Sequence, residues 1–331
     1  MDIELAKEIM ACLPEGRTRF YYFKDRYALL LLRQACKEQQ SIRALRQGQY
    51  ARLLDKAAVG EVIRRSGNGR LTPEQLVNYW PAQFHCYRLS LGLWGSDRKS
   101  RYYQTSRTGY NLVLQMNFSN QHDLCYRRYK IADDEGCFDS YEHPTSDTRN
   151  TMAWSRIDLD LETDTALIEE VQTDWLRFAR EAYDDAQNIR KAKSKVDREK
   201  QERYWFYDFT PEQATEYFEI AVREHLAIWD EAVLSATLEF LLHEIGIRKV
   251  YFHSWETGRR VKHCAPPRSV YRNLPRRFCF QSVSEGPGFL IEDKSSRRKM
   301  KKIDRQSWYL LDFSGVSGGA GINRDCQLLT A

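Results

Sequence analysis

Hydrophobic and polar positions change their spacing along the chain, and this change predicts its organisation. Up to about residue 80, apolar residues recur at helical spacing, most clearly in 25–37 and 50–65. From about 83 to 172 the period falls to two, which is typical of β-strands. The candidate strands are 84–93, 110–118, 124–129, 155–161 and 166–174. We therefore expect a helical N-terminal region (1–80), a mixed core domain (81–313) and a flexible tail rich in Gly and Ser (314–331).

The cleanest alternation lies in the fourth of these strands. Three apolar residues should face inward and two carboxylates outward: Ile157, Leu159 and Leu161 against Asp158 and Asp160. The polar residues 162–165 supply a turn, so 155–174 is predicted to be an antiparallel hairpin. The segment 132–150 is polar and should form a surface loop near this hairpin.

Helical and extended segments alternate in the second half of the chain. A long helical region is expected from 176 to about 246, and its charged middle, 190–203, should project into solvent or contact a partner. A short strand, 248–254, follows, and then a helix at 267–273 and strands at 277–283, 288–291 and 308–313. This order predicts an α/β (α+β) fold with a mostly antiparallel central sheet flanked by helices.

The strand at 166–174 carries the strongest candidate site. Glu170, Gln172 and Asp174 stand at every second position, so they should share one face with Ile168 behind them. The other face should be largely apolar, with Leu167, Glu169, Val171, Thr173 and Trp175. Polar side chains inside a sheet are costly unless they are paired or used. Both a structural hydrogen-bond row and a catalytic site fit this pattern, with Glu170 as general base, and Asp174 fits either the site or the N-cap of the next helix.

Positive charge gathers near the C-terminal end, although the net charge of the whole chain is only +5. Residues 256–305 hold fourteen Lys and Arg against five Asp and Glu, a net +9, so the remaining residues sum to −4. The stretch 257–302 contains most of this charge. Such asymmetry favours a polyanionic partner, either nucleic acid or the phosphates of a cofactor, while a solvated basic loop is the plainer alternative.

Other composition features narrow the class of protein. The eight cysteines are scattered without a C-x-x-C pair, and the seven histidines form no H-E-x-x-H motif, so neither a disulfide framework nor a metal site is expected. No apolar run approaches the roughly 18–20 residues that span a bilayer, and no secretory signal is apparent, which predicts a cytoplasmic protein without a membrane partner. P-loop, dinucleotide and G-x-S-x-G motifs are also missing from the sequence.

The order of elements in the second half resembles the core of GNAT-type N-acetyltransferases. In that comparison, the strand ending at Asp174 is the fourth strand, and the helix closing at Gly246 leads into a splayed fifth strand. The resemblance implies that Tyr271, before the sixth strand, protonates the leaving thiolate of coenzyme A. The family's glycine-containing cofactor loop has no counterpart, because 172–177 contains no glycine. The donor therefore stays open between acyl-CoA and another activated acyl compound.

A second resemblance covers about residues 165–285. The run Glu-Glu-Val-Gln-Thr-Asp-Trp at 169–175, the helix ending at Gly246 and the segment Tyr-Arg-Asn-Leu-Pro at 271–275 are similar to a domain of large polyvalent proteins from phages and mobile elements. That resemblance implies a mobile-element context with nucleic acid nearby. It assigns no chemistry.

Two hypotheses follow from these observations. The first is an acyl- or related group transferase acting on or near nucleic acid. Its candidate residues are Glu170, Gln172, Asp174, His253 and Tyr271 for catalysis, Arg259, Arg260, Lys262 and Arg268 for a phosphate chain, and Arg107 for substrate. The second is a non-catalytic protein that binds nucleic acid or a phage component through 257–302. The sequence does not predict the oligomeric state.

Overall fold

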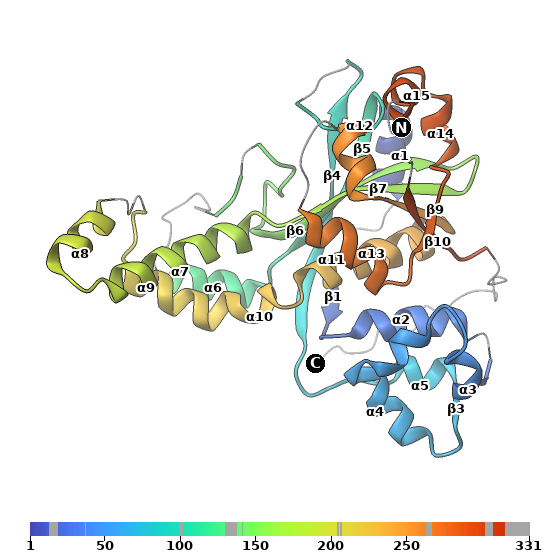
Figure 1. The fold of residues 1–331 in the computed structure, drawn as a ribbon, viewed down its shortest axis with the longest axis horizontal. Helices are drawn as coiled ribbons and strands as arrows, with labels where there is room; N and C mark the ends of the chain where they lie inside the picture. The colour runs from blue at the N-terminus through green and yellow to red at the C-terminus, as the bar shows by residue number, and fades with distance from the viewer. Residues whose placement is uncertain are drawn as a thin grey trace.

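The structure is a computed structural model, and it describes residues 1–12, 19–36, 38–98, 102–129, 138–140, 142–203, 205, 207–262, 267–301 and 307–314. Within these ranges the chain has a mixed α/β fold built on one large, mostly antiparallel sheet with helices around it (Figure 1). The predicted tail, apart from Ser314, lies outside the described residues, as do 132–137 and 141 of the predicted surface loop.

Eight strands form the large sheet in the order β1-β4-β5-β6-β7-β8-β10-β9. Every neighbouring pair is antiparallel except β7 and β8, which run parallel. A separate small sheet pairs β2 with β3. The strands are β1 (Arg19–Tyr22), β2 (Gln40–Ser41), β3 (Arg70–Leu71), β4 (His85–Ser96), β5 (Gly109–Asn117), β6 (Thr151–Asp160), β7 (Thr165–Gln172), β8 (Lys249–His253), β9 (Gln281–Val283) and β10 (Trp308–Asp312).

The helices fill the connections between these strands. The α-helices are α1 (Ile3–Cys12), α2 (Arg26–Ala35), α3 (Ile42–Leu45), α4 (Ala57–Ser66), α5 (Pro73–Val77), α6 (Asn120–Arg128), α7 (Trp175–Lys191), α8 (Lys195–Glu202), α9 (Pro211–Tyr217), α10 (Arg223–Leu226), α11 (Trp229–Glu239), α12 (Trp255–Lys262), α13 (Leu274–Arg277), α14 (Gly288–Glu292) and α15 (Lys294–Met300). A 3-10 turn, η1 (Ala51–Asp55), and π-helical turns η2 (Phe218–Val222), η3 (Phe240–Ile245) and η4 (Ser269–Asn273) complete the set.

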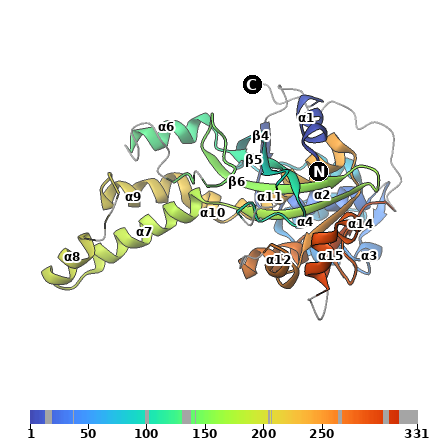
Figure 2. The same ribbon diagram turned by 90° about the horizontal axis from the view of Figure 1, so that it is seen from above.

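The two faces of the sheet are covered by different helices. On one face, Leu167 of β7 packs in a small cluster with Val261 of α12, Leu290 of α14 and Met300 of α15. Figure 2 shows α12, α14 and α15 together on that side of the sheet. On the other face, Ser155 of β6 hydrogen-bonds Thr237 of α11 (2.6 Å), within the main core. The sheet is therefore buried on both faces where β6 and β7 lie.

The predicted hairpin is confirmed, because β6 and β7 pair in antiparallel register around a turn at 161–164. Two helices begin with a capping box. Thr72 and Thr210 each form a capping box with the glutamine three residues later, which satisfies the first free N–H groups of α5 and α9. Gly246 ends η3 with φ 88°, a left-handed conformation that favours glycine.

The N-terminal region contains the expected helices, and it also contributes a strand to the core. β1 pairs with β4 at the edge of the large sheet, in register from Arg19↔Arg88 to Tyr22↔His85. The terminal amine of Met1 donates a hydrogen bond to the buried carboxylate of Asp158 on β6 (2.8 Å). Residues 1–80 are thus joined to the sheet by strand pairing and by a buried ion pair.

Two predicted strands are helices instead. Residues 124–129 belong to α6, where Ser119 caps the first turn and His122 and Tyr126 are buried at a spacing of four. Residues 288–291 belong to α14, where the consecutive residues Phe289 and Leu290 are both buried. Consecutive buried residues fit a strand covered on both faces as well as a helix, so the sequence pattern alone does not separate the two. The predicted strand at 277–283 shortens to β9, because its first residue ends α13.

A helical arm formed by α7, α8, α9 and α10 extends from the sheet, with α8 at its tip (Figure 1). The predicted charged stretch 190–203 lies at this tip, where its described side chains are mostly exposed. The charged segment therefore projects into solvent, as its composition predicts. Among the described residues, every helix is too short or too polar to cross a lipid bilayer.

Candidate functional site

A β-bulge in β7 places the polar side chains differently from the predicted alternation. Ile168 pairs with Ile157, but the next register pair is Glu170 with Arg156, so Glu169 is an extra residue in the ladder. Val171 consequently joins Ile168 in the main core, although strict alternation puts these two on opposite faces. The expectation that Glu170 shares a face with Ile168 is therefore wrong. Glu170 instead lies on the face of Leu167.

The bulge coincides with the end of the parallel pairing between β7 and β8. Their register runs from Thr165↔Lys249 to Ile168↔Phe252 and stops one residue before Glu169. The parallel register therefore does not include Glu169, whose buried backbone carbonyl needs a donor. Lys262 of α12 supplies one through Nζ (2.8 Å), and the Tyr271 hydroxyl of η4 supplies another (2.9 Å).

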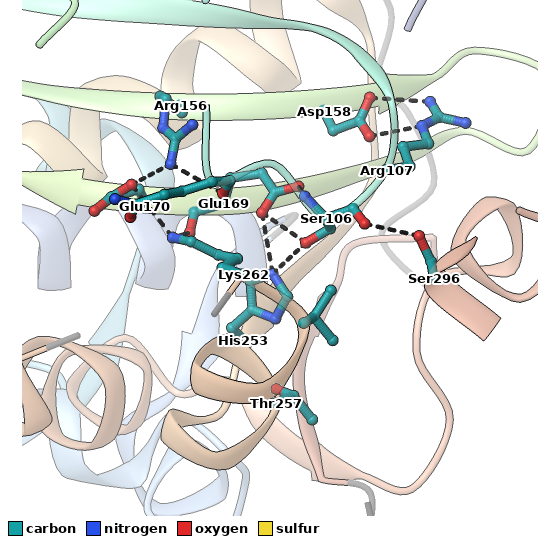
Figure 3. A network of polar contacts seen from close by, with 12 residues as sticks. Ser106, Arg107, Arg156, Asp158, Glu169, Glu170, His253, Thr257, Lys262 and Ser296 are labelled. Carbon is teal, nitrogen blue, oxygen red and sulfur yellow. Dashed lines mark hydrogen bonds and ion pairs between the residues drawn. The ribbon is translucent and has the colours of Figure 1, made fainter. Parts of the chain in front are cut away.

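Lys262 is the centre of the buried network (Figure 3). Its Nζ also donates to Glu170 Oε2 (3.3 Å) and to the Tyr271 hydroxyl (3.0 Å), so three acceptors surround one ammonium group. The side chain of Lys262 is fully buried. Lys262 was predicted to hold a phosphate chain with its exposed neighbours; here it faces the interior instead.

Glu170 is held between two cations, Lys262 and Arg156 of β6. Burial alone raises the pKa of its carboxyl group, but the charges of Lys262 and then Arg156 outweigh burial and lower the pKa to about 2. An effective general base near neutral pH needs a pKa closer to 7. In this arrangement Glu170 is a charged partner in an ion-pair network.

Glu169, which the sequence pattern assigned to the apolar face, is fully buried and makes a second polar cluster. Its carboxylate accepts hydrogen bonds from the Ser106 N–H (2.9 Å) and hydroxyl (2.7 Å), and it lies 3.2 Å from His253 Nε2. Burial raises the pKa of Glu169, but the hydrogen bond and charge of His253, followed by Lys262, lower it to about 2. The sequence feature that indicates Glu169 as a candidate is a carboxylate placed among apolar residues of the same predicted strand face.

Ser106, His253 and Glu169 do not form a nucleophilic relay in this geometry. The Ser106 hydroxyl lies 2.9 Å from His253 Nε2, and the carboxylate contacts that same nitrogen. In a serine triad the carboxylate orients the histidine through the other ring nitrogen. Ser106 and His253 are also buried. The contacts instead anchor the loop that contains Ser106.

Residues 102–107 of that loop lie beside the network, with Ser106 next to Glu169 and His253 and Arg107 next to Asp158 (Figure 3). Arg156 donates to the carbonyl of Tyr103 (2.6 Å), and Ser296 of α15 donates to the carbonyl of Ser106 (2.7 Å). Arg107, predicted to contact substrate, makes a two-point ion pair with Asp158 (2.7 and 2.9 Å). The loop is therefore fastened at both ends of its described part.

Gln172 and Asp174 lie together in a third cluster, at the end of β7, where Gln172 is the last residue paired with β6. Gln172 Nε2 donates to Asp174 Oδ1 (2.8 Å), and His143 Nδ1 lies 2.8 Å from Asp174 Oδ2. Burial raises the pKa of Asp174, but the hydrogen bond with His143 leads the contacts that lower it. Asp174 precedes α7 without capping it. Its neighbour Thr173 accepts the N–H of Leu176 instead (3.3 Å), so the N-cap interpretation is wrong for the Asp174 side chain.

A different set of charges is exposed on α12, η4, α13 and α15, and we call it the basic surface. Its members are the exposed residues Arg259, Arg260, Arg268, Arg272, Arg276, Lys294, Arg297, Arg298 and Lys301. The exposed carboxylates described between residues 255 and 301 are Glu256, Glu285 and Glu292. Lys299 fastens α15 to α12 by donating to the carbonyl of Val261 (2.7 Å). Positive charge therefore dominates these neighbouring helices.

The comparisons with known proteins add no neighbour. No family model, curated protein or solved structure matches this chain.

The described His, Cys, Asp and Glu side chains form no group of three or more that could hold a metal ion. A hollow between α2 and α11, lined by residues such as Tyr27, Leu31 and Leu238, contains no side chain of the buried network.

Proposed function

We propose that the chain binds nucleic acid through the basic surface. The observation that carries this proposal is the exposure of nine Lys and Arg side chains between residues 255 and 301, against three exposed carboxylates among the residues described in that range. Solvated cations on one surface attract the phosphate backbone and release its counterions on binding. The mobile-element resemblance of residues 165–285 is consistent with such a partner.

Charge-neutralising variants at two sites test the proposal. Arg297, Arg298 and Lys301 at α15 become Gln in one variant, and Arg190, Lys195 and Arg203 of the helical arm become Gln in the control. Both variants lose three positive charges from exposed positions. We expect the first variant to bind a labelled DNA oligonucleotide at least roughly tenfold more weakly at low salt, because it loses up to three phosphate contacts. Equal affinity of the two variants would contradict the proposal.

The second candidate function is group transfer at the point where β7 and β8 diverge. It is supported by the convergence of Glu170 and Tyr271 on Lys262, next to the carboxyl ends of a parallel strand pair, where ligands often bind in α/β sheets. Strongly shifted pKa values also gather at functional sites as well as in structural ion-pair networks. The diverging strands resemble the splayed fourth and fifth strands expected of a GNAT-like core.

The residues present do not fit acyl-coenzyme A. Where a GNAT-type loop offers glycine amides to the pyrophosphate, this chain has Thr173 and Asp174 before α7. The carboxyl pKa of Asp174 is lowered, so a negative charge stands at the position that an anionic pyrophosphate would need. The donor for a transferase of this kind is therefore expected to be an activated compound other than acyl-CoA.

Mass spectrometry of small molecules released from the denatured protein tests this second function. A transferase should release an activated donor from the native chain, and the amount should fall in a Glu170→Gln variant that circular dichroism shows to be folded at the temperature of purification. Retention of the same amount by that variant, or release of no donor from the native chain, would argue against group transfer.

A further inference from the structure

Three arginines surround one tryptophan within the basic surface. The guanidinium carbons of Arg259, Arg268 and Arg272 lie 5.2, 4.5 and 5.9 Å from the centre of the Trp255 ring. Trp255 begins α12, whereas Arg268 and Arg272 lie at η4, after the intervening segment. Two elements thus bring their cations to one aromatic side chain, which is itself only partly buried.

The charges of this cluster are not balanced by the carboxylates that the structure places there. Arg272 pairs with Glu256 (2.8 Å), while the ion pairs described for the chain include neither Arg259 nor Arg268. Like charges held around one ring repel each other, and cation–π attraction contributes only about 0.5–1 kcal/mol at an exposed site. An added anion would reduce this repulsion.

We propose that Trp255 and its three arginines bind a single-stranded segment of nucleic acid, with a base stacked in the cluster and its phosphate held by the guanidinium groups. This inference rests on the proposed nucleic-acid binding and names the form of the partner. A single strand exposes the faces of its bases, whereas a duplex keeps them stacked inside. Both indole rings and guanidinium planes stack on bases, and guanidinium groups also bind phosphate with paired hydrogen bonds.

The geometry favours stacking at this position over binding by charge alone. The cations at α15 belong to no described cation–π cluster, whereas those at α12 and η4 converge on an aromatic ring. The α15 cations therefore offer contacts to phosphates of any nucleic acid, and the Trp255 cluster adds a contact that only an unpaired base can make. Preference for single strands should accordingly depend on Trp255.

Two variants and a matched control test the inference in the full chain. Trp255→Leu removes the aromatic ring, and Trp255→Phe keeps a smaller one. Trp80→Leu is the control, because Trp80 is also partly exposed and lies 5.3 Å from a guanidinium carbon, that of Arg26, in a different aromatic cluster. Affinities for an unstructured single strand and for a duplex of the same length are measured at one salt concentration.

We expect the native chain and the Trp80→Leu variant to prefer the single strand, and Trp255→Leu to lose about tenfold in single-strand affinity with little change for the duplex. Trp255→Phe should retain most of the preference. Photocrosslinking of an oligonucleotide that contains 5-iodouracil should link the base to Trp255.

The outcomes separate this inference from the function on which it rests. Binding without single-strand preference, with crosslinks elsewhere and no effect of Trp255→Leu, would overturn the stacking site and leave the basic surface as a phosphate-binding face. Failure of the native chain to bind any nucleic acid at low salt would overturn both. If Trp255→Leu does not fold, the crosslink and the Trp255→Phe affinities decide.

Discussion

Lys262 connects three buried polar groups at the candidate site. Its ammonium group satisfies the carbonyl of Glu169, the carboxylate of Glu170 and the hydroxyl of Tyr271. The Tyr271 hydroxyl is committed as well, because it donates to the Glu169 carbonyl. A buried charge that loses its partner is far more costly than an exposed one. The described contacts therefore make Lys262 and Tyr271 structural members of the buried network.

Replacement of Lys262 by Met should destabilise the protein strongly. The variant leaves Glu170 with Arg156 as its remaining cationic partner, and we expect the free energy of unfolding to fall by about 3–5 kcal/mol. The neighbouring exposed residue gives a control, since Arg260→Met should change stability by no more than about 0.5 kcal/mol. Urea denaturation followed by circular dichroism measures both. Similar stabilities for the two variants would show that the buried ion pairs contribute little.

The two buried glutamates predict how stability depends on pH. Their pKa values are about 2 in the folded protein, below the ordinary value of 4.5. A carboxylate with a lowered folded pKa stabilises the protein above its unfolded pKa, and this contribution is lost as pH falls towards the folded pKa. Stability should therefore drop between pH 4.5 and about 2.

A Glu170→Gln variant tests the origin of this pH dependence. The amide cannot titrate, so the variant should be less stable than the native chain at neutral pH and should lose less stability between pH 4.5 and about 2. Thermal unfolding over that range provides the measurement. An unchanged pH profile in the variant would assign the acid sensitivity to other carboxylates.

At the scale of elements, the bulge in β7 and the loop at 102–107 determine the site together. The bulge turns Glu169 towards Ser106 and His253 and leaves its carbonyl to Lys262 and Tyr271. Ser106 joins the loop to β7 through two hydrogen bonds and to α15 through a third. The sheet, the loop and the helix that carries part of the basic surface are thus mechanically connected.

The Ser106→Ala variant should loosen this loop selectively. It removes the hydroxyl donor to Glu169 but keeps the backbone N–H, so we expect a loss of about 1–2 kcal/mol in stability. Hydrogen exchange of the amides at 102–107 should accelerate, while β5 and β6 should retain their protection. Ser194→Ala, at the exposed N-cap of α8, is the comparison substitution and should leave the loop unaffected. Uniform acceleration across the sheet would contradict a local anchor.

The sequence predicts secondary structure correctly where the hydrophobic alternation and the turn residues indicate the same element. Residues 155–174 alternate over two runs joined by a polar turn, and they form the predicted hairpin. The same alternation fails at Glu169, because one inserted residue moves every later side chain to the other face. No local property of Glu169 marks the bulge; its stabilising contacts come from Ser106, His253 and Lys262, which are distant in sequence.

The residues of the candidate site could also be predicted from the sequence only in part. Glu170, Tyr271 and Lys262 do converge, although the sequence assigned Lys262 to a phosphate grip with Arg259. Helical position explains the difference, because Lys262 and Arg259 stand on the same short helix with one buried and the other exposed. Ser106 could not be predicted at all, since a serine in a polar loop carries no signal of its buried carboxylate partner.

At the scale of the whole molecule, the buried charges of the network balance each other, whereas the exposed charges of the basic surface do not. The buried network pairs Glu169 and Glu170 with Lys262 and Arg156, so its formal charges cancel. The basic surface outside it keeps an excess of exposed cations. Buried pairs respond weakly to salt, whereas exposed cations that bind phosphates respond strongly. Salt dependence therefore reports on the basic surface and not on the buried network.

The most direct measurement is the affinity of the native chain for a DNA oligonucleotide across a series of salt concentrations. A surface that contacts several phosphates should give a log–log slope of about −3 or steeper, since each contacted phosphate contributes about −0.9 for duplex DNA. The account predicts tight binding at about 50 mM salt that weakens severely by about 200 mM. Affinity that does not change with salt, or no binding at the lowest concentration, would contradict it.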